Sequence, residues 1–288
     1  MNSSDIRQRF LFDGTDIRGE ISTLESSYLD ILSRQNYPSA VGQLLGEFLT
    51  AASLLSATLK FPAMVSIQVL GQGPVKTMMA ECFQKTKLRG IVRGDLDTIS
   101  GPQSLRQLLG KATLAITIEP QGGERYQGIV PMDKDTLGEC LEDYFAQSEQ
   151  LATKIKLSAN HQTASGILVQ QMPRTVDKEK SEANWQHIGA LLDSLQSDEQ
   201  LSLSHEDQLY RLFHNENTRL LNAEQLQFYC SCSKPRTAKT LATLGRDEME
   251  SILEEMGSVQ VTCEFCDQRY VFDKKDIEAI FDTDRSLH

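Results

Sequence analysis

Positive charge is scarce in this sequence. The 29 lysines and arginines are outnumbered by 40 aspartates and glutamates, which gives a formal net charge of −11. Nucleic acids and anionic membrane surfaces attract proteins that present a basic face. The charge balance therefore predicts that the protein has neither a nucleic-acid partner nor a membrane partner.

The sequence also lacks a long uninterrupted apolar run. Its most apolar stretch, 41–59, contains Gln43, Glu47 and several serines and threonines, so we interpret it as a core helix rather than a membrane span. The first residues show no basic region leading into an apolar one, so no signal peptide is expected. We expect a cytoplasmic protein, in which a reducing environment disfavours permanent disulfides.

No histidine stands at ligand spacing near the one cysteine cluster. Four of the six cysteines form two close pairs separated by thirty residues, Cys230 with Cys232 and Cys263 with Cys266. Two such pairs brought together supply four thiolates to one tetrahedral zinc ion, and a site closed in this way leaves no open position for catalysis. We predict one Zn²⁺ per chain, bound by these four cysteines, and no catalytic residue.

The spacing of the cysteines leaves their role open. One interpretation is a structural zinc site that holds a small domain together. Another is a redox switch, because close thiolate pairs are oxidisable and their oxidation releases the metal. A thiol-disulfide oxidoreductase that uses Cys263 and Cys266 and a zinc-ribbon module that binds nucleic acid are further alternatives. The remaining cysteines, Cys82 and Cys140, are expected to be buried apolar residues.

Residues 1–175 have the pattern of an α+β domain. The runs 9–12 and 17–21 predict an opening hairpin, and apolar spacing predicts helices over 24–34 and from Pro38 onwards. Short strand-like runs follow at 64–70, 76–82, 88–92, 114–119, 126–130, 152–157 and 167–171, with a helix at 136–147. The short loops between these runs predict sheets rich in antiparallel pairs.

The composition changes in 176–229, which has ten acidic residues against four basic ones, no proline and one glycine. Trp185, Ile188 and Leu192 share one helical face, and Ser204 begins a capping box before Leu209. We predict a helical, acidic connector. It is either a pair of ordinary helices packed on the first domain or a detachable cover over an apolar patch of that domain.

Residues 230–288 predict a small zinc domain. Short helices are expected over 235–244 and 247–256, and two strands, 259–262 and 269–272, flank the second cysteine pair as a zinc-knuckle hairpin. Asp273 or Asp276 is expected to cap a last helix. Few large apolar side chains are available for a core, so metal binding is expected to supply much of the folding energy.

Several short motifs, in their order along the chain, resemble the 33-kDa heat-shock protein family of bacterial chaperones. The resemblance covers the whole chain and includes the complete cysteine pattern together with Arg9–Phe10, Asp16–Glu20, Gly71–Pro74, Ala80–Cys82, Leu88–Gly90, Tyr126–Val130, Pro173–Arg174 and Arg211–His214.

This resemblance implies a redox-regulated, ATP-independent holdase for unfolding client proteins under oxidative stress, and not an enzyme. The reduced, zinc-bound form would be inactive. Oxidation would form the disulfides Cys263–Cys266 and Cys230–Cys232, release zinc, unfold the terminal domain and loosen the connector. The resemblance further implies a cytoplasmic protein that forms a homodimer on activation and passes its clients to ATP-dependent foldases.

Overall fold

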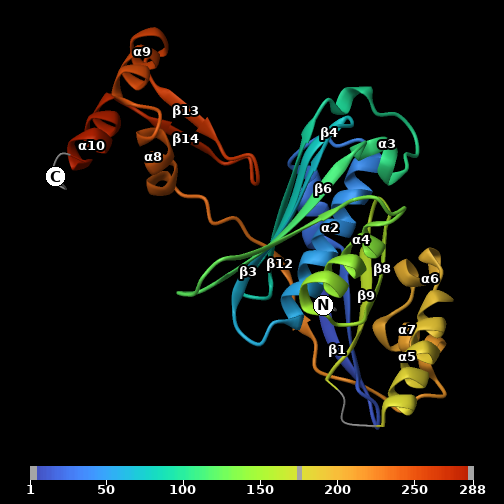
Figure 1. Ribbon diagram of the computed structural model, residues 1–288. Coiled ribbons are helices and arrows are strands. Elements are labelled where there is room, and N and C mark those ends of the chain that lie inside the picture. The colour runs from blue at the N-terminus through green and yellow to red at the C-terminus, as the bar shows by residue number, and fades with distance from the viewer. Residues whose placement is uncertain (1–4, 174–176, 285–288) are drawn as a thin grey trace. The chain divides into compact units, whose positions relative to one another are not determined.

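The computed structural model describes residues 5–173 and 177–284 (Figure 1). Its chain divides into two compact units, Met1–Tyr229 and Cys230–His288. The boundary predicted between residues 175 and 176 falls on 174–176, outside the described residues. The segment that follows it packs within the first unit.

The first unit contains two six-stranded sheets. One has the order β10-β1-β2-β9-β8, with β11 also paired to β1, and every pair in it is antiparallel. Its strands are β1 (Ile6–Phe12), β2 (Ile17–Leu24), β8 (Thr153–Ala159), β9 (Ala164–Gln171), β10 (Thr218–Leu220) and β11 (Glu224–Gln225).

The second sheet has the order β12-β5-β4-β3-β6-β7, and only the β12–β5 pair is parallel. Its strands are β3 (Ala63–Gly71), β4 (Val75–Phe83), β5 (Lys87–Gly94), β6 (Ala112–Pro120), β7 (Tyr126–Pro131) and β12 (Gln227–Phe228). These antiparallel-rich sheets, combined with helices, confirm the predicted α+β fold class.

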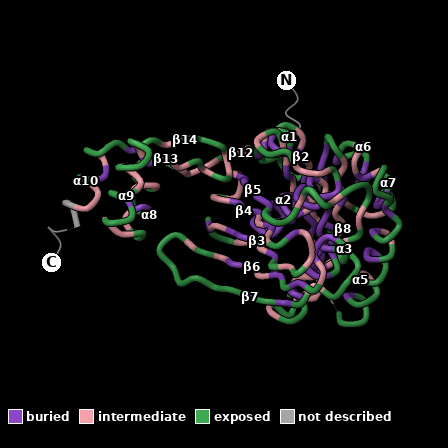
Figure 2. The backbone as a smooth tube through the Cα atoms, turned by 90° about the horizontal axis from the view of Figure 1, so that it is seen from above, coloured by how far each residue is buried: buried purple, intermediate pink, exposed green. Residues whose placement is uncertain are grey.

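Helix α2 (Ser39–Thr58) lies at the centre of the first unit and contacts strands of both sheets, so most of its residues are buried (Figure 2). It is long and apolar enough to span a membrane, but 89% of its apolar window is buried inside the fold, as expected of a core helix. The shorter helices of the unit are α1 (Ser26–Ser33), α3 (Leu105–Leu109) and α4 (Leu137–Tyr144), the last continued by a π-helical turn over Phe145–Glu149.

The helical part of the connector covers the face of the first sheet that lies opposite α2. It consists of α5 (Lys178–Asp193), α6 (Ser197–Ser202) and α7 (His205–Phe213), and Asp177 and Ser204 cap the first and last of these. Leu192, Leu209 and Phe213 join a buried cluster with Phe10, Phe12, Ile17, Ile21, Ile167 and Val169 of the sheet. The connector therefore completes a core.

The prediction of a wholly helical connector is wrong for its last part. After α7 the chain is extended, and it forms β10, β11 and β12 along the edges of the two sheets. These strands have only two or three residues each, too few to show an alternation of apolar and polar positions in the sequence. Their extended conformation comes from pairing with β1 and β5.

The second unit is small. It contains α8 (Lys234–Ala242), α9 (Arg246–Met256), the hairpin of β13 (Val259–Thr262) and β14 (Arg269–Phe272), and α10 (Lys274–Asp284). Asp273 accepts a hydrogen bond from the backbone N–H of Asp276, which confirms the predicted cap. Its buried apolar core consists of Leu241, Met249, Val259, Phe272 and Ile277.

Candidate metal centre

A hairpin turn places the second cysteine pair. Cys263 follows β13 directly, and its backbone N–H donates to the carbonyl of Gln268 at 2.9 Å. The N–H of Asp267 donates to the carbonyl of Cys263 at 2.8 Å, and Asp267 has a positive φ of 58°, which turns the chain sharply towards β14. This is the hairpin that the sequence predicted around the second pair, and it turns Cys263 and Cys266 towards one side.

The first pair lies in the extended stretch between β12 and α8. Cys230 and Cys232 alternate with Ser231, whose hydroxyl accepts a hydrogen bond from Arg236 at 2.8 Å. Ser233 caps α8, and Pro235 stands in its first turn, where its missing N–H costs no hydrogen bond. Because Ser233, the cap of α8, directly follows Cys232, the capped N-terminus of this helix holds the C-terminal end of the segment that carries Cys230 and Cys232.

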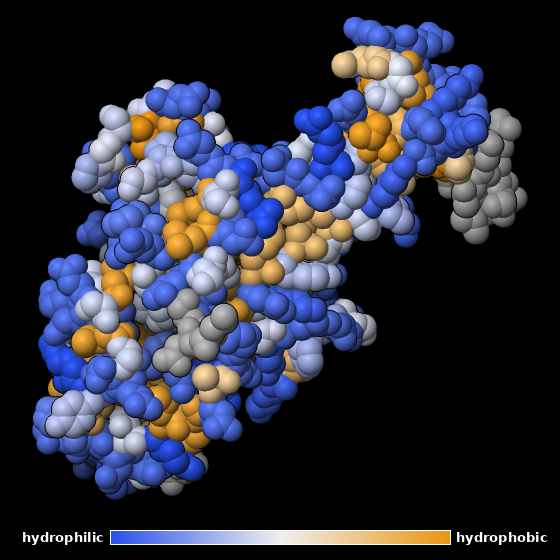
Figure 3. Space-filling view, turned by 180° about the vertical axis from the view of Figure 1, so that it is seen from behind, coloured by the Kyte–Doolittle hydropathy of each residue, from blue (hydrophilic) through white to orange (hydrophobic). Residues whose placement is uncertain are grey.

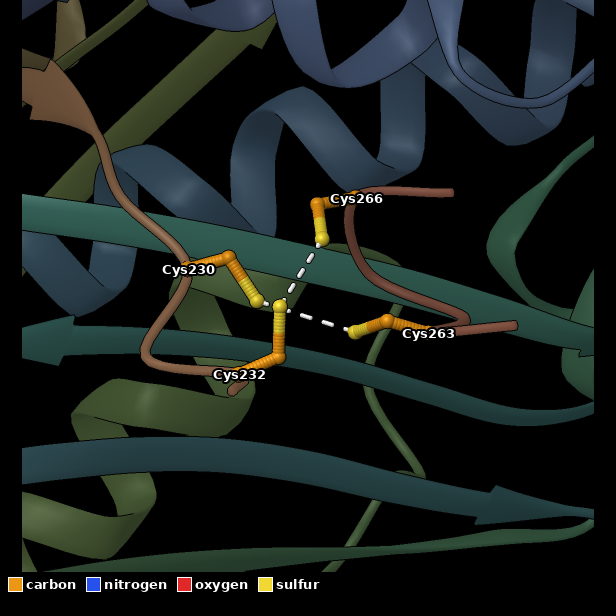
Figure 4. A group of neighbouring side chains, drawn as sticks. All are labelled: Cys230, Cys232, Cys263 and Cys266. Carbon is orange, nitrogen blue, oxygen red and sulfur yellow. Dashed lines mark hydrogen bonds between the residues drawn. The ribbon is translucent and has the colours of Figure 1, made fainter. Parts of the chain in front are cut away.

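The four sulfur atoms converge (Figure 4). All four lie within 4.8 Å of one another, and two contacts cross the pairs, at 3.7 Å from Cys230 to Cys263 and 3.2 Å from Cys232 to Cys266. A zinc ion with four bonds of about 2.3 Å in a tetrahedron separates its sulfur ligands by about 3.8 Å. The sulfur cluster therefore has the size and donor set that a Zn²⁺ ion requires.

The same distances describe thiols rather than disulfides. All six cysteines are free, and separations of 3.2 and 3.7 Å far exceed the sulfur–sulfur bond of about 2.05 Å. The four clustered side chains are half-buried.

Tyr270 is a neighbour of the cluster that the sequence analysis missed. Its hydroxyl donates to the sulfur of Cys232 at 3.1 Å, and this hydrogen bond raises the pKa of Tyr270 to about 12. Burial raises the pKa of the Cys266 thiol. The only signal in the sequence was the position of Tyr270 on the strand that follows the second pair.

Among the described residues, the other cysteines and the histidines of the connector do not belong to this cluster. Cys82 and Cys140 are fully buried in the main core of the first unit, as predicted, and burial raises the pKa of both thiols. His205 is buried between the hydroxyl of Thr23 and the side chain of Gln8, and burial lowers its pKa to about 4.

Comparisons with known proteins point to one protein family over nearly the whole chain. The model of a family described as Hsp33 protein matches residues 5–273. The chain is 45% identical to the 33 kDa chaperonin of Pseudomonas aeruginosa (strain LESB58), and the alignment covers 98% of this chain and 96% of that protein. It is 47% identical to the 33 kDa chaperonin of Hahella chejuensis, over 97% of this chain and 98% of that one.

The chain belongs to the Hsp33 family. A solved structure of an Hsp33 homologue, the 33 kDa chaperonin of Thermotoga maritima, has the same fold. It superposes with a TM-score of 0.84 at 22% identity, over 98% of this chain and 99% of that one. Relatives in this family are named chaperonins rather than enzymes, so the chain is a chaperone-family protein and not an enzyme.

The position of Cys263 and Cys266 also disfavours the oxidoreductase alternative. A reactive Cys-x-x-Cys pair commonly gains its low pKa at the N-terminus of a helix. Here the pair occupies the turn between β13 and β14, with the other two cysteines facing it. Four sulfur atoms gathered in this way could hold a metal ion.

Proposed function

We propose that this Hsp33-family chain is an ATP-independent holdase that binds unfolding proteins, and that oxidation of its four clustered cysteines turns it on. One observation carries the proposal. The connector that completes the core of the first sheet runs directly into a unit whose described residues include five buried apolar ones and four converging thiols. The fold of that unit, and through it the seating of the connector, would depend on the state of the sulfurs.

Cys230, Cys232, Cys263 and Cys266 would hold one Zn²⁺ in the reduced protein. When bound, the ion supplies folding free energy, which is on the order of 10–16 kcal/mol in small zinc peptides. The core of Leu241, Met249, Val259, Phe272 and Ile277 is too small to replace that contribution. The thiolates therefore serve as the structural link between β13, β14 and the segment that leads out of the connector.

Peroxide would break this link. Each disulfide forms when two thiolates lose two electrons, and one peroxide molecule takes up these electrons and two protons to become two water molecules. The sulfurs of a disulfide carry no negative charge for a cation. Disulfides within each pair, Cys263–Cys266 and Cys230–Cys232, would leave the hairpin and the preceding segment unconnected.

A released connector would uncover apolar surface. Phe10, Phe12 and Ile21 lie on the sheet face beneath α5–α7 and are at most 3% exposed. On the face seen in Figure 3, by contrast, the apolar side chains at the surface of the first unit form patches separated by polar ones. A larger continuous apolar surface is what an unfolding protein would bind.

The partners follow from the resemblance to the family. Clients would be unfolded or partly unfolded proteins in the cytoplasm under oxidative stress. The active form would be a homodimer, and reduction of its disulfides would pass the clients to ATP-dependent foldases.

Zinc content measured together with suppression of aggregation tests this function. The test protein would be unfolded by heat or denaturant, and the chain would be added without ATP, before and after peroxide treatment with mild heating. We expect about one zinc per chain before treatment, and its loss as aggregation is suppressed. Zinc that stays bound, with no gain in suppression, would leave the cluster as a structural site.

A further inference from the structure

One segment of the connector lies on the edges of both sheets. Within 218–229, β10 and β11 pair with β1, and β12 pairs with β5. In the part of the chain that the structure describes, β1 and β5 would otherwise be the outermost strands at these ends of their sheets. An uncovered strand edge is a ready template for another extended chain.

Much of this contact is made by the backbone. The N–H of Leu221 donates to the carbonyl of Arg9 at 2.8 Å, and that of Leu226 donates to the carbonyl of Asp5 at 2.9 Å. On the other sheet, Gln227 donates to Thr86 at 3.0 Å and Tyr229 donates to Leu88 at 2.9 Å. Such bonds do not depend on the side chains of the added strand, so chains of many sequences can make them.

The side chains of the segment add a simple selectivity. Leu226 is 1% exposed and reaches the main core, whereas Leu221 in the same segment is 36% exposed. Glu224 forms an ion pair with Arg7, a side chain that is itself 1% exposed. Glu224 lies in β11, and Leu226 follows that strand, with its N–H still bonded to Asp5 beside β1. The edge therefore accepts an apolar side chain with an acidic one two positions before it.

We propose that 218–229 occupies a peptide-binding site formed by the edges of β1 and β5. When the connector is released, an extended segment of an unfolded protein takes this place by strand addition. Its apolar residue fills the position of Leu226, and an acidic residue two positions earlier pairs with Arg7. This inference rests on the proposed holdase function, and it names the contact through which a client is held.

A peptide with the sequence of 218–229 is the direct probe. Fluorescence anisotropy would measure its binding to the full-length chain, reduced and peroxide-treated. We expect it to bind the oxidised chain and to compete with a client in the aggregation assay. In the peptide, Leu226→Ala or N-methylation at Leu226 should weaken binding on the order of tenfold or more, since each removes a buried contact or a backbone hydrogen bond. Leu221→Ala is the matched control and should bind within about twofold.

Equal binding by all four peptides, or no binding to an oxidised chain that does suppress aggregation, would overturn the inference and leave the holdase function standing. An oxidised chain that does not suppress aggregation would instead contradict the holdase proposal itself. Hydrogen exchange supplies a second readout. Client binding should slow the exchange of amides in β1 and β5. If exchange in β1 and β5 is slowed without any client, and more so at higher protein concentration, a second copy of the chain occupies the edges. That result would contradict the proposal.

Discussion

Phe12 and Phe213 meet edge to face, with their ring centroids 4.9 Å apart. Phe12 ends β1 and Phe213 ends α7, so this contact joins the opening strand of the chain to the connector. Phe10 also lies 6.1 Å from Phe213, and its ring packs on Gly19, where an added Cβ would lie 2.0 Å from the Phe10 ring. The connector is thus held on the sheet by the packing of Phe213 against Phe10 and Phe12, and Gly19 leaves the space that the Phe10 ring occupies.

Phe213→Ala should loosen the connector without oxidation. Loss of a buried phenylalanine costs about 3–5 kcal/mol, and here most of the cost falls on the seating of α7. We expect the reduced variant to suppress aggregation partially and to bind a hydrophobic dye more strongly than the unchanged chain does. Tyr210→Ala, on the same helix with a side chain 74% exposed, is the control and should behave as the unchanged chain. A reduced Phe213→Ala protein that does not suppress aggregation would contradict the proposal that the connector covers the client-binding surface.

Cys266→Ala should abolish stoichiometric zinc binding, because three thiolates leave an open ligand position. Cys140→Ala, in the core of the first unit, should keep about one zinc per chain. Zinc analysis of the purified proteins distinguishes the two. Full zinc content in the Cys266→Ala protein would contradict the four-thiolate site.

Removal of zinc by a chelator should unfold the second unit and leave the core around α2 folded. Its core of five buried apolar residues is small, whereas the first unit has a large core around α2. Circular dichroism should report the loss of α8, α9 and α10, and hydrogen exchange should still show protection in α2. Retention of all helix signal at complete metal removal would show that the small core is sufficient.

Tyr270→Phe should speed the peroxide-driven release of zinc. The hydroxyl donates to the sulfur of Cys232, and a hydrogen bond to a thiolate lowers its reactivity. Loss of such a neighbour of a metal ligand typically costs about 10–100-fold in metal affinity or activity. Release would be followed with a colorimetric zinc indicator, with Tyr229→Phe as the control. An unchanged rate would mean that the Tyr270 hydroxyl has no influence on the cluster.

The sequence predicted more of the site than of its surroundings. Cysteine spacing identified the four residues whose sulfur atoms converge, because such a cluster is encoded in residue type and spacing. The strands β1–β9 and the helices α5 and α7 followed from apolar periodicity, whereas α6 did not. The short strands β10–β12 did not, since their conformation comes from pairing with β1 and β5. Tyr270 and the Arg7–Glu224 ion pair were missed for the same reason, as each joins residues distant in sequence.

Acid should weaken the seating of the connector through His205. Burial lowers the pKa of His205 to about 4, below the ordinary value of 6.5, so the folded form holds the imidazole neutral. The unfolded form binds more protons between these values, and the stability contributed by His205 is therefore lost as the pH falls from about 6.5 towards 4. The loss is at most on the order of 3 kcal/mol.

The buried carboxyl of Glu20 has a raised pKa and acts in the opposite direction, so the informative quantity is a difference between variants. Chemical denaturation of the unchanged chain and of His205→Gln would be compared at pH 7 and pH 5. The variant should lose less stability on acidification, whereas His214→Gln, at an exposed position, should follow the unchanged chain. Parallel pH profiles for all three proteins would exclude His205 as the cause.

Hydrogen exchange of the connector, measured in the reduced zinc-bound chain and again after peroxide treatment, tests the central claim most directly. Amides of α5–α7 and of β10–β12 should be protected in the reduced chain and exchange rapidly after oxidation, while α2 keeps its protection. A connector that stays protected in an oxidised chain that has lost its zinc would contradict the account, because the state of the cysteines would then have no effect on the surface beneath it.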